Sequence, residues 1–119
     1  MIKLNLSGHQ NKSLADQGFV MPAILHVDLS DPQLFDKLVD FLRSDCGVES
    51  DSVVTVALPG LAPLAVFVVT AIHGLTGHFP TIVPLVCSEE GGFSPVNPVP
   101  LQVLRNDVAR ASRTGLKAL

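Results

Sequence analysis

A serine, a glycine and a histidine follow one another directly after the first apolar segment of the chain. Ser7, Gly8 and His9 offer a hydroxyl group, a backbone without a side chain and an imidazole, and Lys12 lies three residues further on. Glycine lets backbone N–H groups come close to a phosphate, so this segment is typical of an anion-binding loop. Histidine changes its charge near neutral pH, so His9 can donate to a phosphate or take part in acid–base catalysis. The alternative is an ordinary strand-to-loop turn with an exposed histidine.

A second loop with the same potential is Pro59-Gly60-Leu61. It joins a predicted central strand to a predicted buried helix. The N-terminus of that helix carries free N–H groups and a partial positive charge, which makes the loop a candidate anion-binding site. The alternative is a tight turn that requires glycine.

Signatures of the common cofactor, metal and hydrolase sites are absent from the sequence. There is no G-x-G-x-x-G fingerprint, no Walker-type Gly-Lys-Ser/Thr run and no G-x-S-x-G elbow. The histidines and cysteines have neither C-x-x-C nor H-x-x-x-H spacing, which disfavours a metal site. We therefore expect neither a metal nor a cofactor.

The remaining histidines and the basic residues near the end of the chain have plainer interpretations. His26 lies within a predicted strand and is expected in the core. His73 and His78 lie in a loop predicted at the opposite end of the sheet from the ligand loops, which favours a structural or interface role. The basic residues after residue 100 are explained best as the solvated face of a helix, with a phosphate or partner contact as the alternative.

Strands and helices alternate along the sequence, which predicts a small α/β fold with a mainly parallel, Rossmann-like sheet flanked by helices. We expect strands at residues 2–6, 23–29, 52–58 and 81–87. Pro84 favours an edge position or a bulge for the last of these. Helices are expected from Asp31-Pro32 to about residue 43, from Pro63 to residue 72 or 73 with Gly74 as cap, and over residues 101–113. In the last helix we expect Leu101, Leu104 and Val108 to face inward, and residues 88–100 are predicted to form a mobile loop.

Ligands of open parallel sheets bind beyond the carboxyl ends of the strands. This rule selects the loops at residues 7–12, 28–31, 58–61 and from 88 onward.

The sequence is rich in apolar residues and poor in charged residues. Hydrophobic residues make up 47% of the 119 residues and charged residues only 16%, with a net charge of −3. This excludes a disordered chain and a nucleic-acid binder that relies on overall positive charge, and we expect no binding of duplex nucleic acid. The length fits one domain, residues 1–119. The low charge indicates that more surface is buried than one copy can bury, which favours a homodimer.

No segment reads as a targeting signal or a membrane span. The first nine residues lack a basic region followed by a long apolar run. The apolar stretch at residues 53–72 is interrupted by Pro59-Gly60 and by Pro63, so a strand, a turn and a buried helix explain it better than a span. Two cysteines are fewer than a disulfide-stapled secreted domain has. We therefore expect a cytoplasmic protein without membrane contact.

Three short segments together resemble one family. They read LNLSGH at residues 4–9, LPGLA at 58–62 and HGLTG at 73–77. In this order the chain resembles small CRISPR-associated proteins of type III systems, the stand-alone, ring-nuclease-like group with a Rossmann-like fold related to CARF domains. The resemblance implies a homodimer that binds a cyclic oligoadenylate, with cyclic tetra-adenylate as the leading candidate, across its two-fold axis. It also implies that Ser7, Gly8, His9, Gly60 and Leu61 line the ligand.

The combined expectation is a ligand site made of two loops. Its members are Ser7, Gly8, His9, Lys12, Pro59, Gly60 and Leu61. The ligand would be sequestered, or cleaved without a metal by attack of a ribose 2′-OH, with His9 as the candidate catalytic residue and Ser7 orienting the phosphate. Higher assembly on ligand binding is compatible with the sequence. An α/β scaffold or interaction protein without a nucleotide ligand is the alternative.

Overall fold

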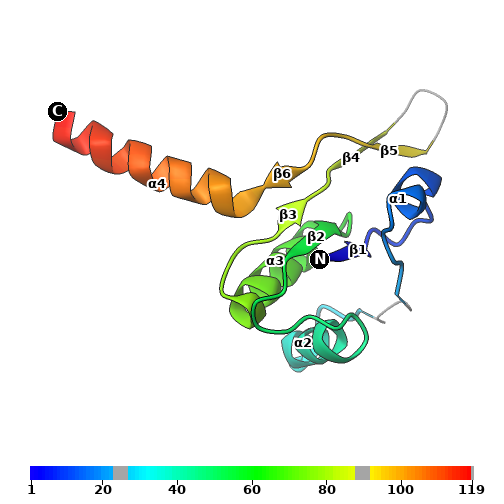
Figure 1. Ribbon diagram of the computed structural model, residues 1–119. Helices are drawn as coiled ribbons and strands as arrows, with labels where there is room; N and C mark the ends of the chain where they lie inside the picture. The colour runs from blue at the N-terminus through cyan, green and yellow to red at the C-terminus, as the bar shows by residue number, and fades with distance from the viewer. Residues whose placement is uncertain (23–26, 88–91, 119) are drawn as a thin grey trace.

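A central sheet of four strands runs in the order β1-β2-β3-β6 in the computed structural model, which describes residues 1–22, 27–87 and 92–118, with side chains of the last helix to Arg113. Strand β1 (Ile2–Asn5) pairs in parallel with β2 (Val54–Ala57), and β2 pairs in parallel with β3 (Thr81–Ile82). Strand β6 (Val99–Pro100) joins β3 in the antiparallel sense. The fold is therefore α/β with a mixed sheet (Figure 1).

A second, smaller sheet lies beside the first. Strands β4 (Leu85–Cys87) and β5 (Phe93–Pro95) form an antiparallel pair. The structure thus has antiparallel as well as parallel pairs, and the predicted mainly parallel arrangement extends over β1, β2 and β3 alone.

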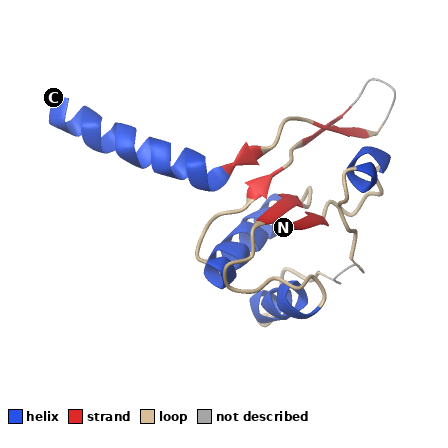
Figure 2. Ribbon diagram, viewed as in Figure 1, coloured by secondary structure: helices blue, strands red, loops and turns tan. Residues whose placement is uncertain are grey.

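Three helices lie against the sheets and a fourth extends outward. Helices α2 (Leu34–Ser44) and α3 (Ala62–Thr76) contact each other on one side of the central strands, and α1 (Lys12–Asp16) contacts β5 (Figure 2). Helix α4 (Leu101–Ala118) follows β6 and points away from the rest of the molecule. No helix in the described part of the chain is both long and apolar enough to cross a membrane.

Apolar side chains cover both faces of strand β2. Val54 and Val56 belong to the larger core cluster, which β1, α2 and α3 complete. Ala57 belongs to a smaller cluster together with Leu14 of α1. Burial on both faces explains why residues 52–58 read as a nearly continuous apolar run.

The second predicted strand is not observed where the structure can be described. Residues 23–26, which include His26, lie outside the described residues, and Val27 to Leu29 are not in a strand. Beside β1, on the side away from β2, the described chain makes a single parallel bridge between Leu4 and Val20.

The predicted fourth strand is divided in two at Val83 and Pro84, because a proline has no N–H to donate to a neighbouring strand. The prediction of one loop over residues 88–100 was wrong for its described part. Phe93–Pro95 pairs with β4 and Val99–Pro100 pairs with β3.

The helices begin and end differently from the predictions. Helix α2 begins after Gln33, whose N–H donates to the Asp31 carboxylate at 2.8 Å in a turn that precedes the helix. Helix α3 continues through Gly74 and ends at Gly77, whose left-handed φ of 85° is suited to glycine. No helix was predicted before residue 31, yet residues 12–16 form α1, and the Asn11 side chain caps it by accepting from the Leu14 N–H at 3.1 Å.

Helix α4 corrects a further prediction. It runs five residues beyond the predicted end at residue 113, and Leu104 and Val108 are exposed rather than inward. Of the three residues predicted to face inward, Leu101 in the first turn is partly buried.

Candidate functional site

The carboxyl ends of β1 and β2 lie next to each other, and the two loops singled out in the sequence follow them. Asn5 is in register with Ala57, and the N–H of Leu6 donates to the Ala57 carbonyl at 2.9 Å. The chain then continues into Ser7 on one side and Pro59 on the other. Parallel pairing therefore brings the two loops to one edge of the sheet.

A buried amide, that of Asn5, organises the first loop. Its Oδ1 accepts from the Ser7 N–H at 3.1 Å and from the Ser7 hydroxyl at 2.6 Å. Its Nδ2 donates to the His9 carbonyl at 2.9 Å. The Asn5 residue is only 4% exposed and its three hydrogen bonds are partly buried, so they hold the loop in one shape. Sequence reasoning missed Asn5; the available signal was an amide two residues before Ser7, at the end of the predicted strand.

Gly8 makes the turn that this network encloses. Its φ of 82° lies in the left-handed region, where a side chain is strained. Gly60 in the second loop has no such φ, and a Cβ at either position would meet no neighbour within 4 Å. The two glycines therefore differ in backbone conformation but not in available space.

This difference gives a matched pair of variants. We expect Gly8→Ala to lower the free energy of unfolding by about 1 kcal/mol through left-handed strain, and Gly60→Ala to leave it within about 0.5 kcal/mol of wild type. Urea unfolding followed by circular dichroism measures both. Equal losses in the two variants would show that the positive φ of Gly8 is not what requires glycine there.

The second loop leads into the N-terminus of α3. Leu61 is the N-cap residue, and its side chain makes no capping hydrogen bond. The first intrahelical bond runs from the Ala65 N–H to the Leu61 carbonyl at 3.0 Å, so the N–H groups of Ala62 and Leu64 have no partner within the helix. The first turn carries no acidic residue. This end of α3 presents free donors and a partial positive charge.

The two loops line one pocket with a volume of about 320 Å³. Five of the seven predicted site residues lie on its wall: Ser7, Gly8, Pro59, Gly60 and Leu61. The remaining lining residues come from the end of β1 and the residue after it, from α2 and α3, and from the chain before α2: Asn5, Leu6, Met21, Pro22, Val27, Leu38, Phe41, Leu64 and Val68. None of these lining residues is charged, so the pocket favours a flat apolar group with a few hydrogen-bonding atoms.

His9 and Lys12 lie in a different hollow. It is lined by both residues together with Gln10, Asn11, Leu85, Gly92 and Phe93. The His9 ring stacks on Phe93 of β5 with centroids 5.3 Å apart and planes 26° apart. The Asn11 Nδ2 donates to the Phe93 carbonyl at 2.9 Å, which ties the first loop to the smaller sheet. The structure thus places these two residues beside the pocket rather than on its wall.

The third predicted ligand loop, residues 28–31, folds on itself. The Asp28 carboxylate accepts from the Ser30 N–H at 2.9 Å and from its hydroxyl at 2.6 Å. A side-chain hydrogen bond from Lys37 and a backbone bond from Gln33 lower the pKa of the Asp31 carboxyl. Within the described chain, Val27 lies on the pocket wall and residues 28–31 do not.

Among the described residues, His73, His78 and the two cysteines do not line this pocket. The His73 ring contacts that of Phe79 with centroids 4.3 Å apart, near the end of α3. Both cysteines are free; burial and then the charge of Asp45 raise the pKa of Cys46 to about 11, while Cys87 is exposed. Among the described residues, no three His, Cys, Asp or Glu side chains come together as a metal site.

No protein-family model, curated protein or solved structure matches this chain. What the pocket binds is therefore inferred from its own residues.

Proposed function

We propose that the chain binds a cyclic oligoadenylate, with cyclic tetra-adenylate as the leading candidate, and thereby lowers the level of this second messenger in type III CRISPR signalling. The protein would act as a homodimer of Rossmann-like, CARF-related domains, in which the pocket occurs twice. The observation that carries the proposal is the convergence of both motif loops, Ser7-Gly8 and Pro59-Gly60-Leu61, on one pocket.

The chemistry of the pocket supports such a ligand. Its apolar wall accommodates an adenine ring, for which Leu61 and Leu64 offer aliphatic surface. The free N–H groups at the start of α3 can donate to a phosphate, whereas the Ser7 hydroxyl already gives its single proton to Asn5 Oδ1. Backbone donors bind a phosphate without a basic side chain, which reconciles an anionic ligand with a chain of net charge −3. A symmetric ring of phosphates suits a two-fold site.

Sequestration agrees better with the pocket than cleavage. In metal-free cleavage the ribose 2′-oxygen attacks phosphorus, the 5′-oxygen leaves, and a proton passes from the first oxygen to the second, which leaves a 2′,3′-cyclic phosphate and a 5′-hydroxyl. Such a transfer needs a titratable group near the phosphate. None of the described residues on the pocket wall has a titratable side chain, and the His9 imidazole is stacked on Phe93. Cleavage through His9 remains the second candidate because the His9 backbone belongs to the loop that Asn5 organises.

Incubation with cyclic tetra-adenylate separates these functions. We expect the melting temperature to rise and chromatography to recover an intact ring, because a ligand that binds the folded state stabilises it by about 2.7 kcal/mol at 100 times its Kd. Linear tetra-adenylate, which lacks the closed ring, is the control ligand. Linear products that disappear in His9→Ala would support the nuclease. An unchanged melting temperature at cyclic tetra-adenylate concentrations far above micromolar would overturn ligand binding. The alternative of a scaffold or interaction protein without a nucleotide ligand would then hold.

A further inference from the structure

Helix α4 projects from the molecule as an arm (Figure 1). The radius of gyration is 15.8 Å, against about 13.5 Å expected for a compact chain of this length. Most of the stability of a helix in a protein comes from packing of its apolar face, so a projecting helix such as α4 gains from a partner.

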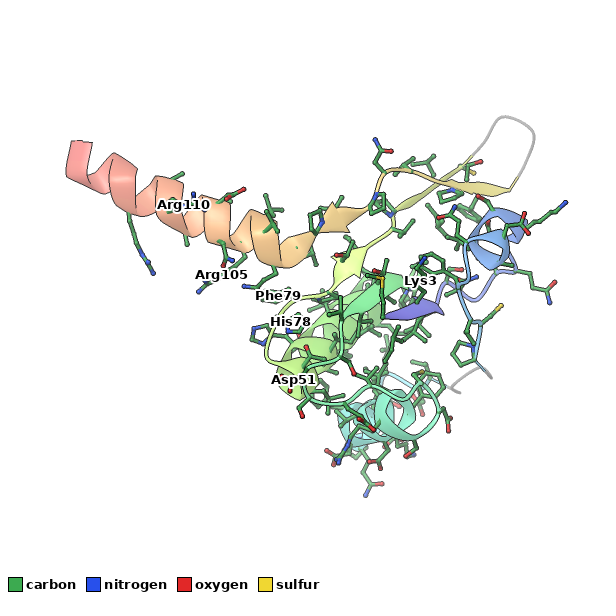
Figure 3. The ribbon with its side chains drawn as sticks, viewed as in Figure 1. Lys3, Asp51, His78, Phe79, Arg105 and Arg110 are labelled. Atoms are coloured by element: carbon green, nitrogen blue, oxygen red, sulfur yellow. The ribbon has the colours of Figure 1, made fainter. Side chains whose placement is uncertain are left out.

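The base of the arm is held firmly. The Phe79 N–H donates to the Gln102 side chain at 2.8 Å, and the Leu101 N–H donates to the Pro80 carbonyl at 3.3 Å. Strand β6, directly before α4, is paired with β3. These bonds fix the direction in which the arm leaves the sheet. Arg105 lies nearer its base and Arg110 further along it (Figure 3).

One side of the arm is apolar and uncovered. Leu101, Leu104, Val108 and Ala111 are spaced by three, four and three residues, which is the spacing of a seam that packs against another helix. Leu104 is 50% exposed and Val108 is 59% exposed. We call these four residues the arm stripe.

A second uncovered apolar surface lies on α3. Its exposed residues Pro63, Val66, Phe67, Thr70 and Gly74 lie on one side of that helix, and we call them the α3 face. The Thr70 hydroxyl donates to the Val66 carbonyl at 2.8 Å, so it has a partner within the helix. The rings of Phe67 and of Phe35 on α2 are nearly perpendicular, with centroids 6.3 Å apart, and Phe35 thereby widens the apolar patch.

The two surfaces match in length and in charge. The α3 face spans about 16 Å and the arm stripe about 15 Å along their helix axes. Residues 101–119 hold four basic residues and one acidic residue, a net +3, whereas residues 1–100 hold four basic and ten acidic residues, a net −6. Two arms repel each other, and an arm is attracted to the body of another copy. Helix α2, which packs beside α3, carries Asp36 and Asp40 together with Lys37 and Arg43, so the attraction comes from the net charge of residues 1–100 as a whole.

We propose that α4 is an exchange arm, and that in a homodimer the arm stripe of each copy packs on the α3 face of the other. The contact is reciprocal and closes under a two-fold axis. The contact needs no ligand; it rests on the homodimer of the proposed function and names the two surfaces that form it, whereas ligand binding is tested separately by the melting temperature. Because α3 begins directly after Leu61, the arm of the second copy lies beside the pocket loop.

Sedimentation of the ligand-free protein tests the exchange. We expect a dimer for the wild type, and at least a 100-fold rise in the dimer dissociation constant for Val108→Asp on the arm and for Val66→Asp on the α3 face. Val103 is 54% exposed on another side of α4, so Val103→Asp is the matched control and remains dimeric. All three positions are exposed, and circular dichroism and the melting temperature confirm that the variants fold.

Mixing the two disruptive variants tests the reciprocal geometry. The intact arm of Val66→Asp fits the intact face of Val108→Asp, so the mixture is expected to associate where neither variant does alone. A wild-type protein that is still monomeric at a concentration of about 100 μM would overturn the proposal. A Val66→Asp protein that stays dimeric while Val108→Asp dissociates would overturn it in favour of arm-to-arm pairing. A mixture that stays monomeric would also contradict the exchange.

Discussion

Replacing Asn5 by alanine is expected to lower the free energy of unfolding by about 2–3 kcal/mol and to remove the stabilisation by cyclic tetra-adenylate. The variant leaves the Ser7 N–H, the Ser7 hydroxyl and the His9 carbonyl without the amide that pairs them. Losing a buried partner costs about 1–3 kcal/mol, and here one residue serves three groups. Without the amide the loop has no single shape, and binding must order it. Urea unfolding and ligand-induced melting shifts measure the two effects.

Asn11→Ala is the control for this prediction. Asn11 caps α1 and bonds the Phe93 carbonyl, but it does not line the pocket. We expect a loss of about 1 kcal/mol in unfolding free energy, as for other N-caps, and an unchanged melting shift at matched occupancy. Ligand affinity within twofold of wild type in Asn5→Ala would show that the amide stabilises the fold without shaping the site.

Local patterns predicted the elements that carry the pocket. Alternating apolar and polar residues predicted β1, and a continuous apolar run predicted β2. Pro63 followed by an apolar run predicted α3. The strands after Pro84 were not predictable in the same way. Strand β5 is a three-residue segment that pairs antiparallel with β4 across residues 88–91. Short segments of this kind form through contacts with their partner rather than through their own periodicity.

The sequence also grouped His9 and Lys12 with Ser7 and Gly8, because they are neighbours in the chain. The structure places the first two against Phe93 and the others on the pocket wall. The backbone turns at Gly8 with a positive φ, and adjacency in sequence does not fix the direction of side chains beyond such a turn. The periodicity of α4 shows a similar limit. It reveals an apolar side but not what covers that side, and so Leu104 was predicted inward.

The Ser7→Asp substitution is expected to weaken the binding of cyclic tetra-adenylate about 100-fold. Asparagine has almost the same size as aspartate but no charge, and Ser7→Asn is expected to weaken binding less than tenfold. Ser7 lines the pocket, and its hydroxyl already bonds Asn5. If a phosphate lies against this loop, a carboxylate at Ser7 repels it. At an effective dielectric constant of about 20 and a separation of about 6 Å, the repulsion is about 3 kcal/mol, which corresponds to the expected factor. Titration calorimetry measures both variants against wild type.

Salt and pH distinguish repulsion from a distorted loop. Repulsion between exposed charges weakens as salt screens them, so the gap between Ser7→Asp and Ser7→Asn is expected to narrow several-fold from about 0.05 to 0.5 M salt. The introduced carboxyl group is neutral once protonated, so the gap also closes as the pH falls toward 4, while the affinity of Ser7→Asn stays flat. A gap that persists unchanged at high salt would mean that the aspartate disturbs the Asn5 network. Equal affinities in the two variants at every salt concentration would place the phosphates away from Ser7 and leave the pocket to the adenine ring alone.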